Sequence, residues 1–128
     1  MSNYDLANNP NTSPETLARL ANDGYYDVRC GVALNPNTSP KTLARLANDL
    51  NWIVRSDVAI NPNTPLKALE HLANDGQWYV RLEVARNLNT SPEILERLSY
   101  DVDYLVRRKV ANNPSTPQYI RTYLKFMD

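Results

Sequence analysis

Hydrophobic residues recur along this chain at helical spacing and form two alternating sets. The first set follows the order Leu-x-x-Leu-Ala, and its first copy is Leu17, Leu20 and Ala21. An i, i+3, i+4 spacing places three side chains on one face of a helix. Each copy therefore predicts a helix of about eleven residues, which we name the leucine helix. The later copies are Leu43, Leu46, Ala47; Leu69, Leu72, Ala73; and Leu95, Leu98, Ser99.

The second set follows each leucine helix and combines an aromatic residue with two valines and an alanine. Its offsets are again helical, and they predict a shorter second helix, which we name the valine helix. Proline soon after the last alanine ends it in most copies, because the residue before proline avoids the α region. We expect the aromatic residues to lie in the core beside the valines. The four copies are Tyr26, Val28, Val32, Ala33; Trp52, Val54, Val58, Ala59; Trp78, Val80, Val84, Ala85; and Tyr104, Val106, Val110, Ala111.

Turn residues separate these helices. A threonine precedes every leucine helix, and its hydroxyl suits an N-cap that accepts a first-turn N–H. Gly24 and Gly76 suit the C′ position after two of the leucine helices, whereas Leu50 and Val102 take that place in the others, so this turn is less strictly specified. Asparagine recurs just before the threonines, where its side chain can bond turn backbone two residues on. The threonines are Thr12, Thr38, Thr64, Thr90 and Thr116, and the asparagines are Asn9, Asn35, Asn61, Asn87 and Asn113.

Both helices and their turns return every 26 residues without an insertion. Self-similarity at one fixed period of this length is the mark of a solenoid. The sequence therefore predicts a single all-α solenoid domain of paired short helices. Its expected divisions are an N-terminal cap at 1–8, repeats at 9–34, 35–60, 61–86 and 87–112, and a C-terminal capping helix at 113–128.

Composition narrows the function classes. The 14 basic and 14 acidic residues cancel, so no overall field favours nucleic acid or an anionic membrane. No apolar run resembles a secretory signal or a membrane span, and we expect a cytoplasmic protein. His71 and Cys30 have no metal-ligating or nucleophile-activating partner nearby in the sequence, and the chain holds only three glycines. We therefore expect no enzyme activity, no cofactor, no metal and no small-molecule substrate.

The combination of Val-Arg-x-x-Val-Ala, Asn-Pro-Asn-Thr, Leu-x-x-Leu-Ala and a closing aspartate resembles the leucine-rich repeat variant family of bacterial proteins. The resemblance covers essentially the whole chain. It implies a right-handed superhelix of paired helices, the shorter one sometimes of 3₁₀ type, that serves as a binding scaffold. One member of the family carries an iron–sulfur cluster on a cysteine-rich segment outside the repeats. Cys30 is the only cysteine here, so that cofactor does not transfer.

Two charged ladders share the period, and they admit two interpretations. Four arginines at helix-to-helix spacing could follow a phosphate backbone, which would make the chain a nucleic-acid-binding array. Alternatively, each arginine pairs with an aspartate within its unit or with helix C-terminal carbonyls and stabilises the stack. The equal number of acids favours this second interpretation, and the aspartates can also cap the valine helices. The ladders are Arg29, Arg55, Arg81 and Arg107, and Asp23, Asp49, Asp75 and Asp101.

Positions that differ between units are the natural place for function, because the scaffold needs the positions that agree. Positions 27, 30 and 34 and their equivalents differ, and their i, i+3, i+7 spacing places them on one face of the valine helix. We predict a scaffold that binds another protein or a peptide through this face. Burial of the same residues between repeats remains an open alternative. The candidate partner-binding residues are Ile53, Ile60, Tyr79, Leu82, Arg86, Leu105 and Arg108.

Overall fold

The computed structural model describes residues 1–127, which form ten α-helices and no strand in this range. Valine helices are the odd-numbered elements and leucine helices the even-numbered ones. In chain order they are α1 (Asn3–Ala7), α2 (Pro14–Leu20), α3 (Tyr26–Leu34), α4 (Pro40–Leu46), α5 (Trp52–Ile60), α6 (Leu66–Leu72), α7 (Trp78–Arg86), α8 (Pro92–Leu98), α9 (Tyr104–Asn112) and α10 (Gln118–Met127).

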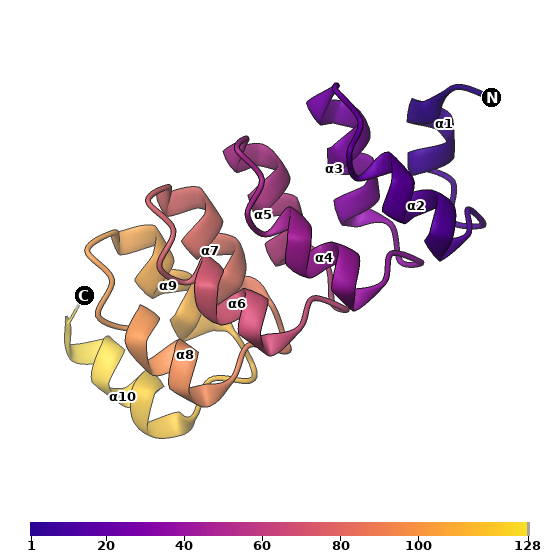
Figure 1. Ribbon diagram of the computed structural model, residues 1–128. Coiled ribbons are helices and arrows are strands. Elements are labelled where there is room, and N and C mark those ends of the chain that lie inside the picture. The colour runs from indigo at the N-terminus through magenta and orange to yellow at the C-terminus, as the bar shows by residue number, and fades with distance from the viewer. Residues whose placement is uncertain (128) are drawn as a thin grey trace.

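The helices stack in two layers along an elongated array, with the two ends of the chain at opposite ends of the stack (Figure 1). Valine helices form one layer, in which each helix packs closely on the next. Leucine helices form the other layer, in which neighbours make few contacts with each other and pack mainly on the valine helices. This arrangement is an α-solenoid, as the sequence predicted.

The relative lengths of the two helices are the reverse of those predicted. The leucine helices α2, α4, α6 and α8 have seven residues, and the valine helices from α3 onward have nine. Three of the leucine helices, α2, α4 and α8, begin later than expected. Proline is the first residue of each, and the serine before it is the N-cap. All valine helices in the described part of the chain are α-helical rather than 3₁₀.

The predicted threonine N-caps are wrong by one residue. Ser39 caps α4, because its hydroxyl accepts the Thr42 backbone N–H at 3.2 Å. The preceding Thr38 turns the other way, and its hydroxyl donates to the Val32 carbonyl at 2.6 Å. All five threonines make this bond to the end of the preceding valine helix, which gives a second donor to a carbonyl that also accepts the backbone N–H of the asparagine three residues later.

The two glycines are not the C′ residues that the sequence suggested, and no glycine among the described residues has a positive φ. The leucine helices end at Ala21 and Ala73 in right-handed conformation, so Gly24 and Gly76 lie beyond the helix ends. A Cβ at either glycine would meet no atom within 4 Å. Leucine and valine can therefore take the same place in the other units without strain.

The core runs through the whole stack between the two layers. Its largest fully enclosed members include the first leucine of each Leu-x-x-Leu stripe and most valines of the valine helices. Because each unit supplies only part of this core, burial depends on neighbouring units, and short helices that would be marginal alone become stable.

Buried asparagines link the units through hydrogen bonds. Asn61 donates its side-chain amide to the carbonyl of Ala33 near the end of α3 at 2.8 Å, and to the carbonyl of Asn35 in the turn that follows α3 at 3.1 Å. Its carbonyl oxygen accepts the Asn63 backbone N–H at 2.8 Å, which is the turn bond that the sequence predicted. The equivalent pair of amide bonds recurs at Asn35, Asn87 and Asn113. One side chain thus holds its own turn and joins two units.

Candidate functional site

A row of aromatic side chains lies on the surface at the start of the valine helices. Trp52, Trp78 and Tyr79 are 38%, 40% and 39% exposed. Tyr79 contacts both tryptophans edge to face, with ring centroids 6.0 Å from Trp52 and 5.4 Å from Trp78. We define the aromatic row as these three residues with the exposed neighbours in the adjoining units, which are Tyr25, Tyr26, Tyr104 and Leu105.

The prediction that the repeated aromatics lie in the core is therefore wrong. Trp52 is the first residue of α5 and lies two positions before the buried Val54. Two positions on an α-helix correspond to about 200°, so the two side chains point to nearly opposite sides. The hydrophobic periodicity placed the tryptophan with the valines, whereas the angle between them indicates a surface position.

The arginine ladder connects one unit to the next. Arg55 Nε and Nη2 donate to the two carboxylate oxygens of Asp75, at 2.7 Å and 3.2 Å. Arg55 Nη1 donates to the Asp49 backbone carbonyl at 2.7 Å. Both side chains of the ion pair are largely buried. Arg29 and Arg81 repeat the three bonds with the equivalent partners.

This geometry confirms that the arginines pair with aspartates and corrects two other parts of the prediction. The ladder aspartates do not cap the valine helices, whose N-caps lie two residues later, as at Gln77. The carboxylate belongs to the following unit, 20 residues later, and not to the unit of the arginine. The aspartate also holds the turn before its own valine helix, since Asp75 Oδ1 accepts the Gln77 backbone N–H at 2.9 Å. Ion pairing and turn formation thus occur in the same residue. The last ladder arginine, Arg107, donates to the Asp101 carbonyl at 2.8 Å and lies over the Tyr104 ring.

The structure separates the predicted partner-binding residues into three groups. Tyr79 and Leu105 are exposed and Ile53 is half-buried, all near the start of the valine helices. Ile60 and Arg86 are exposed near the ends of α5 and α7, where Arg86 pairs with Glu83 and helps line a hollow of about 220 Å³.

Leu82 is only 5% exposed and belongs to the core, so its predicted place in the binding surface is wrong. Residues at its position face the next valine helix, as the interaction of Cys30 in α3 with Asp57 in α5 indicates. Arg108 occupies the same position on α9, and no valine helix covers it within residues 1–127. It is therefore exposed.

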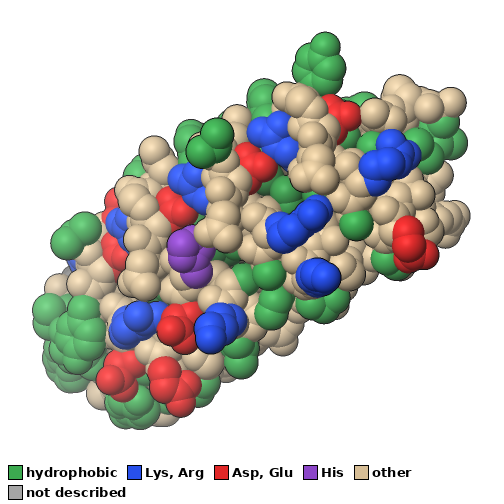
Figure 2. All heavy atoms as spheres, viewed as in Figure 1, with side chains coloured by type: hydrophobic (Ala, Val, Ile, Leu, Met, Phe, Trp, Pro, Cys, Tyr) green, Lys and Arg blue, Asp and Glu red, His purple; other side chains and the backbone are tan. Residues whose placement is uncertain are grey.

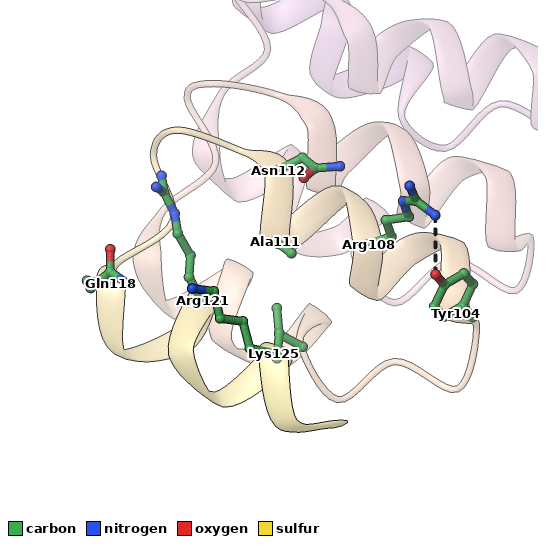
Figure 3. Close-up of a pocket in the computed structure, with 8 residues that line it drawn as sticks. Tyr104, Arg108, Ala111, Asn112, Gln118, Arg121 and Lys125 are labelled. Atoms are coloured by element: carbon green, nitrogen blue, oxygen red, sulfur yellow. Dashed lines mark hydrogen bonds between the residues drawn. The ribbon is translucent and has the colours of Figure 1, made fainter. Parts of the chain in front are cut away.

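Arg108 lines a pocket of about 540 Å³ between α9 and α10, at the end of the array (Figure 3). It donates to the Tyr104 hydroxyl at 3.2 Å. Arg121 and Lys125 reach the pocket from α10, 26 residues after the buried Leu95 and Ser99. The pocket is thus the stacking face of the last described unit, and charged residues replace the small and apolar ones that the inner units carry there.

Three titratable groups between the valine helices are buried or half-buried, and their pKa values are raised. Burial and a hydrogen bond with Asp57 raise the pKa of the Cys30 thiol to about 12, which makes it a poor nucleophile. Burial raises the pKa of Asp57 and also that of Glu83, although Arg86 opposes the second shift. No group of three or more His, Cys, Asp or Glu residues in the described chain could hold a metal ion.

Charge is mixed rather than segregated on the surface. Figure 2 shows basic and acidic side chains interspersed on the visible face, together with apolar side chains at several places along the array. No described helix is long and apolar enough to cross a membrane.

Fold and surface together define a helical repeat protein whose units are held by side chains that recur at the same place in each unit. Two segments of the sequence match models of a known protein family. Residues 2–49 match the Leucine Rich Repeat Variant domain, and residues 78–103 match the Leucine rich repeat variant. The chain belongs to the leucine-rich repeat variant family. Comparison with curated proteins gave no match.

Proposed function

We propose that this protein is a non-enzymatic scaffold that binds a segment of another protein along the aromatic row. The observation that carries the proposal is the cluster of Trp52, Trp78 and Tyr79, which lies partly exposed across two neighbouring units. Aromatic residues supply large contact areas at low entropic cost and are enriched at the centres of protein interfaces.

The chemistry of the row favours a partner with apolar side chains. Leu50 and Val102 are almost fully exposed in the turns that precede α5 and α9, close in sequence to the row. Several exposed apolar residues close together on an otherwise mixed surface are typical of a partner-binding site. A segment that offers aliphatic or aromatic side chains at the spacing of the units would contact several of them together.

The arginine ladder is less suited to bind nucleic acid than the sequence alone suggested. Arg29, Arg55 and Arg81 each commit three N–H groups to a carboxylate and a carbonyl. A phosphate would have to displace a bidentate carboxylate from each arginine that it contacts. The zero net charge offers no compensating long-range attraction.

Selection from a random-peptide display library, with the immobilised protein as bait, tests the proposal. We expect enriched peptides to carry several apolar side chains and to bind Tyr79→Lys at least about tenfold more weakly than wild type, as expected of a hot spot. Leu66→Ala is the matched control, because Leu66 is equally apolar and 52% exposed but lies on the leucine layer.

Two results would contradict the proposal. One is that the selected peptides bind the Tyr79 variant as well as they bind wild type. The other is that random single-stranded DNA or RNA binds with an affinity that falls steeply as salt rises, which would favour the nucleic-acid alternative.

A further inference from the structure

The first unit holds a pocket of about 400 Å³ between α1 and the start of α3. Two carboxylates, Asp23 and Asp27, and two tyrosines, Tyr4 and Tyr25, are among the residues that line it. We propose that this pocket binds the guanidinium group of an arginine side chain from a partner peptide. The site goes beyond the aromatic-row proposal and does not depend on it.

The chain itself shows how arginine is bound at this position in the other units. Asp49, Asp75 and Asp101 each receive a bidentate arginine from the preceding valine helix, with Nε to Oδ2 distances of 2.7–2.8 Å. Asp23 is the equivalent residue of the first unit, 26 positions before Asp49. Its carboxylate is presented in the same way, since Oδ1 accepts the Tyr25 backbone N–H at 2.9 Å, as the other ladder aspartates do.

In the first unit an asparagine stands where the arginine would be. Asn3 lies 26 positions before Arg29 and donates one side-chain N–H to Asp23 Oδ2 at 3.0 Å. Asparagine is shorter than arginine and carries no charge, so it leaves both the pocket and the negative charge of Asp23. Among the described residues, Asp23 is the one ladder aspartate without an arginine ion pair.

The electrostatics of the pocket suit a cation. Hydrogen bonds from the Tyr25 backbone and the Asn3 side chain lower the pKa of Asp23, so its carboxylate is ionised at neutral pH. Asp27 adds a second carboxylate to the lining. Arg29 is the nearby cation, and its Nε and Nη2 are bound to Asp49. The Arg29 charge also helps to lower the pKa of Asp23, but no arginine or lysine in the described chain forms an ion pair with the Asp23 carboxylate.

Two features favour arginine over lysine. A guanidinium group can reach both carboxylate oxygens in a planar fork, whereas an ammonium group acts as a single point charge. The exposed rings of Tyr4 and Tyr25 line the same pocket, and aromatic rings stack well on a guanidinium plane.

The test is a titration of the isotopically labelled protein with Nα-acetylarginine amide, followed through backbone amide chemical shifts. We expect saturable shifts that are confined to residues around Asp23 and Asp27. The lysine amide and the citrulline amide, which keeps the shape of arginine without its charge, should bind about fivefold more weakly or worse. Equal binding of the arginine and lysine amides, or no saturable shift near Asp23, would overturn the proposal.

Two variants make the assignment specific. Asn3→Arg extends the ladder and fills the pocket with an internal guanidinium, so we expect it to melt at or above the wild-type temperature and to lose probe binding. Asp23→Asn removes the carboxylate and should also lose the probe. If Asp23→Asn does not fold, probe binding by Asn3→Arg still tests whether the pocket is the site. Unchanged probe binding by a folded Asn3→Arg variant would show that the arginine position is not the site.

Discussion

Arg55 in α5 holds Asp75 of the next unit through two hydrogen bonds, at 2.7 Å and 3.2 Å, and the same guanidinium group holds the Asp49 carbonyl of its own unit. One side chain therefore fixes the turn before its own helix and the turn before the next helix. Because the ion pair is largely buried, its loss would leave a carboxylate without its main partner.

We expect Arg55→Ala to lower the free energy of unfolding by about 1–3 kcal/mol, the range for a charged hydrogen-bonded partner that is removed. Arg55→Lys keeps the charge but loses the fork, so it should recover only part of this loss. Urea titrations of both variants measure the effect. Wild-type stability in Arg55→Ala would show that the ladder does not hold the stack.

The asparagine ladder should contribute at least as much as the arginine ladder. Asn61→Ala removes the bonds to the Ala33 and Asn35 carbonyls and one bond within the turn, and it takes the side-chain donor away from the buried Ala33 carbonyl. We expect a loss of about 2–4 kcal/mol. Asn63→Ala is the control, because its bond to Pro36 is exposed, and it should cost less than about 1 kcal/mol. Equal losses in the two variants would contradict the assigned role.

A substitution at Leu82 tests whether this residue belongs to the core rather than to the predicted binding surface. Leu82→Ala should cost about 2–4 kcal/mol, because the side chain is buried and its removal opens a cavity. Leu88→Ala, at an exposed leucine, should change stability by less than about 0.5 kcal/mol. Thermal melts of the two variants check the difference. A neutral Leu82→Ala would return this residue to the list of surface candidates.

Asp57 gives a prediction about pH. Burial raises the pKa of this carboxyl in the folded protein, although the hydrogen bond with Cys30 opposes the shift, and Glu83 of the next helix raises it further. A raised folded-state pKa means that the folded protein binds the proton more readily than the unfolded chain. The ionised carboxylate is therefore destabilising at neutral pH, and this penalty is relieved as the pH falls through the raised pKa toward about 4, the ordinary value.

We expect Asp57→Asn to be more stable than wild type at neutral pH. The difference should shrink as the pH approaches about 4, where the wild-type carboxyl becomes protonated. Urea titrations at several pH values measure it. A difference that is constant with pH, or that grows toward acid, would show that the folded state does not disfavour the charged form of Asp57.

Much of the fold could be predicted because its signals are repeated and local. The leucine stripe and the Val-x-x-x-Val spacing indicate two helices, and the fixed period indicates that they stack. The structural role of the arginines followed from their identity in every unit. The partner of each arginine did not follow, because Asp49 and Asp75 have the same sequence context and only the stacking geometry brings Asp75 to Arg55.

The surface was harder to predict than the scaffold. Position 82 differs between units, and variation alone cannot distinguish a binding residue from one that fits a neighbour of variable size. Leu82 faces the next valine helix and is buried, whereas Arg108 at the same position is exposed because that neighbour is absent within residues 1–127. Burial between units depends on the neighbouring unit, which a single-helix pattern does not contain.

Residues common to all units hold the stack, and we propose that the aromatic row binds the partner. The most direct test is the affinity of one selected peptide for Tyr79→Lys, with wild type and Arg55→Lys measured in parallel. The lysine stem at position 79 retains part of the packing, so the Tyr79 variant should melt far closer to wild type than Leu82→Ala does. We predict that the Tyr79 variant loses at least about tenfold in affinity while folded Arg55→Lys binds like wild type. Retained affinity in Tyr79→Lys, together with lost affinity in folded Arg55→Lys, would contradict the claim and make the arginine ladder the binding site.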